Sequence, residues 1–238
     1  MPLPKTELPL YTMVLPGSKK KITYRPFVTR EVKILHQASE GGSEDEILQS
    51  IKQVANNCIM LPENIDVDKL PIIDLEYLFI KLRCRSVGEI IQARFQCQKP
   101  LPSGEICNNI VSIPVNLETL EVTMPKTNFS IVMIDKDYGI KMKYPTFEAM
   151  SKYNADDLEV IAESIESVFK GEEVYDTFTV PEAVEFLLGL KQETYNKVLE
   201  FFENQPEIKV DLAFQCKKCG FKDTVSINGL EELSDFFD

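Results

Sequence analysis

Two cysteine pairs, each set in a similar stretch, constrain this chain more than any other feature of its sequence. The first stretch holds Phe95-Gln96-Cys97, then nine residues, then Cys107 and the run Val111-Ser112-Ile113. The second holds Phe214-Gln215-Cys216, then two lysines, then Cys219 and the run Val225-Ser226-Ile227. Because Phe-Gln-Cys and Val-Ser-Ile occur in both, the sequence predicts one β-hairpin pattern used twice, with two thiols in each copy.

Four thiolates from two hairpins suit a zinc ion, which prefers four soft ligands in a tetrahedron. The predicted ligands are Cys97, Cys107, Cys216 and Cys219. They would fill the coordination shell and leave no position for water or substrate. The sequence therefore predicts a structural Zn²⁺ and no catalytic metal.

The two halves of the predicted site differ in how typical they are. Cys216 and Cys219 have the spacing of a zinc knuckle, and Gly220 after them allows a tight turn. The interval between Cys97 and Cys107 is longer than usual and contains Pro and Gly, which predicts a loop within a widened knuckle. Two alternatives remain open at this point: all six cysteines are ordinary reduced thiols, or some form disulfides. Disulfides are disfavoured because we expect no secretory signal and a chain this long does not need them.

Composition limits the classes of partner. The chain has 238 residues, a formal charge of −12 and a sequence pI of about 4.7, so its surface should repel a phosphate backbone. We expect no nucleic-acid partner, although Lys19-Lys20-Lys21 is a compact basic run. No apolar run reaches the ~20 residues of a membrane span, so no membrane partner is expected. The cysteines and the expected lack of a signal peptide favour a reducing cytoplasm.

Enzyme motifs are absent from the sequence. It has no glycine-rich phosphate loop and no nucleophile elbow, and its single histidine cannot build a typical metal-hydrolase cluster. Acidic pairs such as Asp156-Asp157 fall at predicted helix starts, where carboxylates serve as caps. We therefore expect no catalysis and no small-molecule substrate.

Hydrophobic periodicity predicts an α+β fold, in which a zinc-ribbon-like pair of β hairpins carries a helical insertion and follows an N-terminal helical region. The expected parts are an extended proline-punctuated arm at 1–28, the N-terminal helical region at 29–88, a zinc-pinned β unit at 89–144 and 206–229, the helical insertion at 145–205, and an acidic tail at 230–238. The arm has two interpretations left open: it binds a partner, or it folds back onto its own domain.

Within these parts, helices are predicted from caps and apolar spacing and strands from β-branched runs. The predicted helices are 29–38, 43–58, 74–85, 146–153, 156–169, 180–188 and 192–203. The predicted strands are 21–27, 89–96, 109–115, 118–122, 129–134, 140–143 and 208–215, with 172–177 extended or looped.

The N-terminal region carries a family resemblance. The residues concerned are Pro2-Leu3-Pro4-Lys5, Glu7-Leu8-Pro9, Lys20-Lys21-Ile22, Tyr24-Arg25-Pro26-Phe27 and Glu31-x-Lys33-Ile34-Leu35. Together they resemble the baseplate hub or hub-assembly protein family of T-even-like contractile-tailed bacteriophages. The most specific part is the Tyr-Arg-Pro-Phe block followed by Glu-x-Lys-Ile-Leu.

The resemblance implies a hub subunit or an assembly factor of the tail baseplate, without enzymatic activity. It implies other phage tail and hub proteins as partners. It places the protein in the host cytoplasm during tail assembly, with the baseplate of the virion as the second location. The alternative from another class is a zinc-ribbon nucleic-acid-binding or transcription adaptor protein, against which the acidic charge counts.

Overall fold

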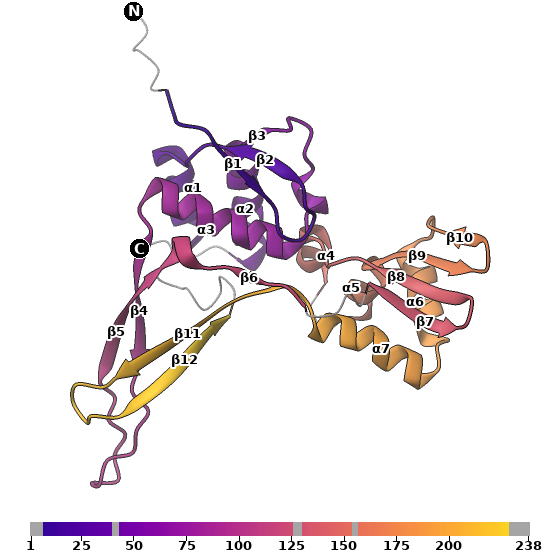
Figure 1. Cartoon of the computed structure of the whole chain (residues 1–238). Helices are drawn as coiled ribbons and strands as arrows, with labels where there is room; N and C mark the ends of the chain where they lie inside the picture. Colours follow the sequence, from indigo (N-terminus) through magenta and orange to yellow (C-terminus); the bar gives the residue numbers. More distant parts are fainter. Residues whose placement is uncertain (1–6, 40–42, 126–129, 154–156, 229–238) are drawn as a thin grey trace, which may run out of the picture.

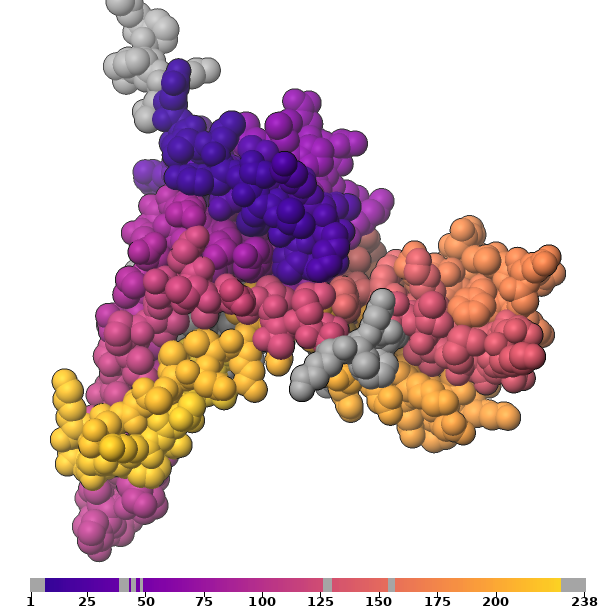
Figure 2. All heavy atoms as spheres, in the orientation of Figure 1, coloured from indigo at the N-terminus to yellow at the C-terminus, as the bar shows by residue number. Residues whose placement is uncertain are grey.

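The chain is a mixed helical and sheet protein, which confirms the predicted α+β class. A computed structural model describes residues 7–39, 43–125, 130–153 and 157–228. The elements form three groups: an N-terminal lobe, a pair of long hairpins and an outer lobe (Figures 1 and 2). The N-terminal lobe and the outer lobe each have a hydrophobic core, and a further core joins the hairpins to a helix of the N-terminal lobe.

The N-terminal lobe packs helices against a small sheet. Its helices are α1 (Thr29–Ser39), α2 (Glu44–Cys58) and α3 (Ile72–Ser86), and its strands are β1 (Tyr11–Val14), β2 (Lys21–Tyr24) and β3 (Ile59–Leu61). The predicted capping box at Ser43 and Glu46 is present and begins α2. α4 (Phe147–Lys152) joins this lobe, because Phe147 is buried in its core.

Helix α3 is buried on two faces and connects two cores. Leu78 and Leu82 face the core of the N-terminal lobe, whereas Ile80 and Cys84 face the core beneath the hairpins. The apolar spacing of Leu75, Leu78 and Leu82 predicts the first face, within the predicted helix at 74–85, and does not predict the second. Cys58 and Cys84 are buried, as expected for small apolar side chains.

Two antiparallel hairpins form the part of the molecule that carries the four cysteines. The first pairs β4 (Ile90–Gln96) with β5 (Ile110–Asn116), and the second pairs β11 (Glu207–Gln215) with β12 (Lys222–Asn228). A short strand, β6 (Val122–Thr123), pairs with the start of β11. The two hairpins cross each other at an angle and extend away from α3 (Figure 1).

The outer lobe covers one face of a four-stranded sheet with helices. The sheet order is β10-β9-β8-β7, built from β7 (Ile131–Asp135), β8 (Tyr138–Met142), β9 (Ile165–Lys170) and β10 (Glu173–Tyr175). The helices are α5 (Leu158–Glu163), α6 (Val180–Leu188) and α7 (Gln192–Glu203). Their apolar faces share one core with the inner side of the sheet.

The predicted helix at 156–169 is wrong in its second half. The observed helix α5 ends at Glu163, and Ile165–Lys170 forms the strand β9. Ile165 and Val168 fit helical spacing, but Ile165 and Ser167 are also buried alternately, as in a strand. Pairing with β8 decided the outcome, and the predicted helical insertion therefore contains two strands of this sheet.

The predicted strand at 118–122 is also wrong. A 3₁₀ turn occupies Leu117–Thr119, and only Val122–Thr123 forms a strand. Asn116 begins the turn by accepting a hydrogen bond from the backbone N–H of Glu118. This local bond competes with an extended backbone and explains the difference.

The described part of the predicted arm folds onto its own lobe. Leu15, Ile22 and Tyr24 are buried in the N-terminal core, which supports the second interpretation for this part. Residues 1–6 of the arm and the acidic tail at 230–238 lie outside the described residues. The domain boundaries as a whole stay predictions.

Among the described residues, no helix combines the length and the apolar character needed to cross a membrane.

Candidate metal centre

The four predicted ligands meet where the two hairpins cross. Cys97 follows the end of β4 and Cys107 lies in the loop before β5, whereas Cys216 and Cys219 lie in the turn between β11 and β12. Gly220, with φ of 74°, is in the left-handed region that this turn requires. Each hairpin therefore presents two sulfurs from its turn region.

The sulfurs are at the distances of a tetrahedral thiolate site. All four Sγ atoms lie within 4.8 Å of one another. The Cys97–Cys219 and Cys107–Cys216 sulfur pairs are 3.7 and 3.8 Å apart. A tetrahedron with Zn–S bonds of ~2.3 Å has edges of about 3.8 Å. Disulfide bonds would need sulfurs about 2.05 Å apart, so these cysteines are free thiols.

Backbone N–H groups bend back onto the sulfurs, as is usual around thiolates. The N–H of Lys99 points to Cys97, that of Asn109 to Cys107, and those of Lys218 and Cys219 to Cys216. The side-chain amide of Asn109 adds a contact of 3.5 Å to the sulfur of Cys216. Hydrogen bonds to the charged form favour that form, which prepares the sulfurs for a cation.

The pKa values of Cys216 and Cys97 are shifted in opposite directions. The backbone N–H groups of Cys219 and Lys218, against the opposing effect of burial, lower the pKa of Cys216 to about 6. The Lys99 N–H lowers the pKa of Cys97, but burial and the neighbouring thiols outweigh it and raise that pKa to about 12. The backbone N–H groups around Cys216 thus favour its thiolate form. The thiolate is the form that binds a metal, so metal binding at the cluster would release protons.

Two lysine side chains near the cysteines make contacts between the hairpins. The ammonium group of Lys218 donates to the carbonyl oxygen of Cys107 at 3.0 Å, which links the two hairpins. Lys99 lies 5.2 Å from the centre of the Phe221 ring. Each of these two lysine side chains therefore contacts a residue of the other hairpin.

The two hairpins share one core with α3, and a separate small core surrounds the cysteines. Its buried members are Cys97, Cys107 and Cys216, with Leu101 and Phe214 among the half-buried residues around them. The arrangement therefore fits the chemistry of the predicted group: four soft donors, closed to solvent, joining two hairpins. Such a site supplies cross-linking and offers no open coordination position.

The structure brings all four predicted residues together and adds two contributors that the sequence analysis missed. Asn109 and Lys218 connect the hairpins through the contacts given above. Neither has a sequence signal, because both contacts depend on the angle at which the hairpins cross. Among the described residues, these cysteines are the one group of His, Cys, Asp or Glu with metal-binding geometry.

Comparison with known proteins gives one match. The sequence model of a family described as "T4 bacteriophage base plate protein" matches residues 8–238, which span all three groups of elements. No curated protein and no solved structure matches the chain.

Proposed function

Because the chain belongs to the T4 bacteriophage base plate protein family, we propose that it builds the hub at the centre of the tail baseplate, as a subunit or as an assembly factor. The family match from residue 8 to residue 238 supports the role in the baseplate, and the place in the hub rests on the N-terminal resemblance. In this role the protein acts by contacts with other tail proteins and catalyses no reaction. It works in the host cytoplasm while tails are assembled.

The metal centre gives this proposal a physical basis. We propose that Cys97, Cys107, Cys216 and Cys219 hold a structural Zn²⁺ that fixes the angle between the two hairpins. The sulfur–sulfur distances of 3.7 and 3.8 Å and the small local core support this assignment. Cys97 and Cys219 are 122 positions apart, so the ion would close a very long loop. Without it the crossing near the turns would keep only the small core around the cysteines, whereas the core shared with α3 would remain.

The shape of the molecule suits a protein that holds others. Its three groups of elements project in different directions and present separate surfaces (Figure 2). Several large apolar side chains are exposed on them, among them Leu10, Ile110 and Leu188. Such residues are expected where a protein is covered by neighbours in an assembly.

Deletion of the gene, with complementation from a plasmid, tests the function. We expect heads without tails from the null phage, and normal tails when the wild-type gene is supplied. Cys219→Ser should fail to restore tails, whereas Cys58→Ser should restore them. Normal tails from the null phage would refute the proposal.

Metal content and location complete the test. The protein purified from infected cells should contain one zinc per chain, together with stoichiometric tail proteins. Immunogold labelling at the centre of isolated baseplates would support the hub, and labelling at the rim would contradict it. Salt-sensitive binding to DNA would instead support the adaptor function.

A further inference from the structure

The outer lobe has an open sheet edge at β10. This strand, Glu173–Tyr175, is the last in the order β10-β9-β8-β7 and pairs only with β9 among the described residues. It lies at the far end of the lobe, away from the hairpins (Figure 1). Lys170 and Glu173 pair across a two-residue turn, so the alternation of an antiparallel ladder directs the N–H and C=O of Val174 outward.

An apolar row leads to this edge on the face of the sheet opposite the helices. Met133 pairs with Gly139, Gly139 with Phe169, and Phe169 with Val174, so these four residues form one line across the strands. Val174 is 63% exposed and Met133 is 41% exposed. Polar residues normally occupy the solvent face of an antiparallel sheet, so this row is unusual.

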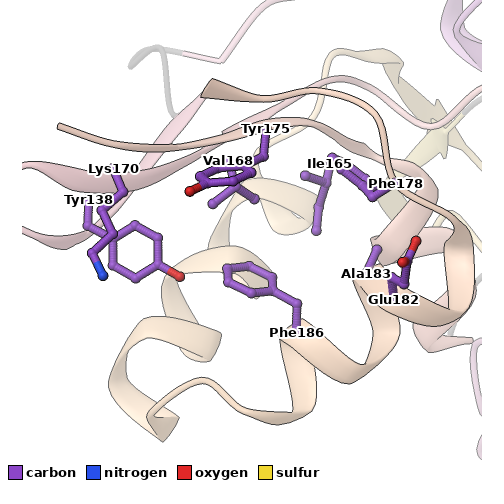
Figure 3. A pocket seen from close by; sticks show the side chains of 9 residues that line it. All are labelled: Tyr138, Ile165, Val168, Lys170, Tyr175, Phe178, Glu182, Ala183 and Phe186. Atoms are coloured by element: carbon purple, nitrogen blue, oxygen red, sulfur yellow. The ribbon is translucent and has the colours of Figure 1, made fainter. Parts of the chain in front are cut away.

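On the other face, a pocket opens beside the same edge. It has a volume of about 350 Å³ and is lined by side chains of β8, β9, β10 and α6. Figure 3 shows Tyr138, Val168 and Tyr175 approaching from the sheet and Phe186 from the helix opposite. Lys170 lies at one end and Glu182 at the other. The lining is mainly apolar, with a few polar groups at the margin, as is typical of binding pockets.

The charged residues around β10 indicate which kind of protein segment could bind at this edge. Between residues 170 and 190 the chain has five acidic residues and one basic residue, Lys170, which pairs with Glu173. The acidic residues are Glu172, Glu173, Asp176, Glu182 and Glu185, and all are exposed. A second copy paired along this edge would bring these carboxylates together, which disfavours it. A segment with Lys or Arg would meet opposite charge.

We propose that the open edge of β10 binds an extended segment of another protein, which carries alternating apolar side chains and Lys or Arg and adds to the sheet as a fifth strand. The backbone of Val174 would supply the new hydrogen bonds. Alternate apolar side chains of the segment would enter the pocket or extend the row ending at Val174. The proposal rests on the proposed function only in taking the partner to be a protein.

The test uses the full chain and a defined probe. The probe is a fluorescent, end-capped peptide with the sequence Lys-Val-Lys-Val-Thr-Val-Lys, and its binding is followed by anisotropy. We expect saturable binding that is lost when alternate amides of the peptide are N-methylated on the edge facing the protein. N-methylation removes backbone donors and keeps the side chains, so it needs no change to the protein.

Protein variants locate the binding. Glu173→Lys should weaken binding about fivefold, as expected for one exposed charge pair. Glu63→Lys, the same charge change on the exposed surface of the N-terminal lobe, should leave binding unchanged. Val174→Pro should weaken binding at least tenfold, with circular dichroism as the control for folding.

Three results would overturn the proposal: no saturable binding, equal binding of the methylated peptide, or a wild-type dimer that Val174→Pro converts to a monomer. The last would identify a second copy as the occupant. The gene deletion described above is independent of this test. Tail-less particles together with failed peptide binding would remove this site and leave the proposed function standing.

Discussion

The carboxylate of Asp74 accepts a hydrogen bond of 2.9 Å from the backbone N–H of Ser18. It also accepts one from Gly17, and the Asp74 side chain is fully buried at the start of α3. The turn between β1 and β2 is thereby fixed to the helix that connects two cores. This side chain and the burial of Leu15, Ile22 and Tyr24 together hold the N-terminal hairpin on its own lobe.

Replacing Asp74 should loosen that hairpin. Asp74→Ala leaves two half-buried N–H groups without their acceptor, and we expect a loss of about 2–3 kcal/mol in the free energy of unfolding. Asp74→Asn retains one acceptor oxygen and should lose less. Urea denaturation of both variants measures this difference. A loss below about 0.5 kcal/mol for Asp74→Ala would show that Asp74 does not hold the turn.

The second prediction concerns pH and the buried Glu31. Its carboxylate contacts Arg25 at 3.0 Å and accepts from the backbone N–H of Val28 at 2.9 Å. Burial alone would raise the pKa of Glu31, but the Arg25 and Val28 hydrogen bonds outweigh it and hold the pKa below its usual value. A lowered pKa gives stability that is fully present above about pH 4.5 and is lost as pH falls through the folded-state pKa.

Glu31→Gln should remove this pH dependence. It should also cost about 3 kcal/mol at pH 7, because it leaves the charge of Arg25 without its partner. The difference in stability between wild type and variant should shrink as the pH falls below about 4.5. Thermal melts between pH 3 and pH 7 measure it. A constant difference over this range would contradict the assignment.

The sequence predicted well those elements whose signals are local. Ser43 with Glu46 identified the start of α2, and the predicted helix at 192–203 has the bounds of α7. In both, capping and periodicity act within a few residues and agree with each other. The pairing of cysteines was also predictable, because only four of the six lie in repeated hairpin patterns.

Some elements depend on contacts with residues far away in the sequence. Capping and periodicity do not predict these elements. Ile165 and Val168 continue the spacing of α5 but pair with β8, which precedes them by more than twenty residues. The second apolar face of α3 was missed because its partners, such as Ile208, lie far along the chain. The sequence also could not give the crossing angle that brings Asn109 to Cys216.

The third prediction uses the close approach of β8 and β9. A Cβ atom on Gly139 would lie 2.6 Å from Cζ of Phe169 and 3.0 Å from the carbonyl oxygen of Val132. Gly139→Ala should therefore destabilise the outer lobe by about 1–3 kcal/mol. Adding Phe169→Leu should recover part of the loss, because the Val132 contact remains. Denaturation of both variants, with Phe169→Leu alone as control, measures the coupling. Equal losses with and without Phe169→Leu would exclude this steric cause.

The last prediction concerns metal removal. A strong zinc chelator should release one zinc per chain and expose the amides of β4, β5, β11 and β12 to hydrogen exchange. Protection in the outer lobe should persist, because that lobe has its own core. Cys216→Ser and Cys219→Ser should show the same selective loss without chelator. Cys58→Ser changes a buried thiol outside the cluster and should retain the zinc.

Comparing these variants distinguishes the stability contributed by metal binding from the stability contributed by burying a thiol. A structural zinc site is worth roughly 10 kcal/mol in small zinc domains, far more than one buried thiol. The ligand variants should therefore lower the melting temperature of the hairpins much more than Cys58→Ser does. Equal melting temperatures, or purified protein without zinc, would mean that the four sulfurs meet only as thiols. The hairpins would then be held by the core that they share with α3, by the small core around Phe214 and by the Lys218 contact.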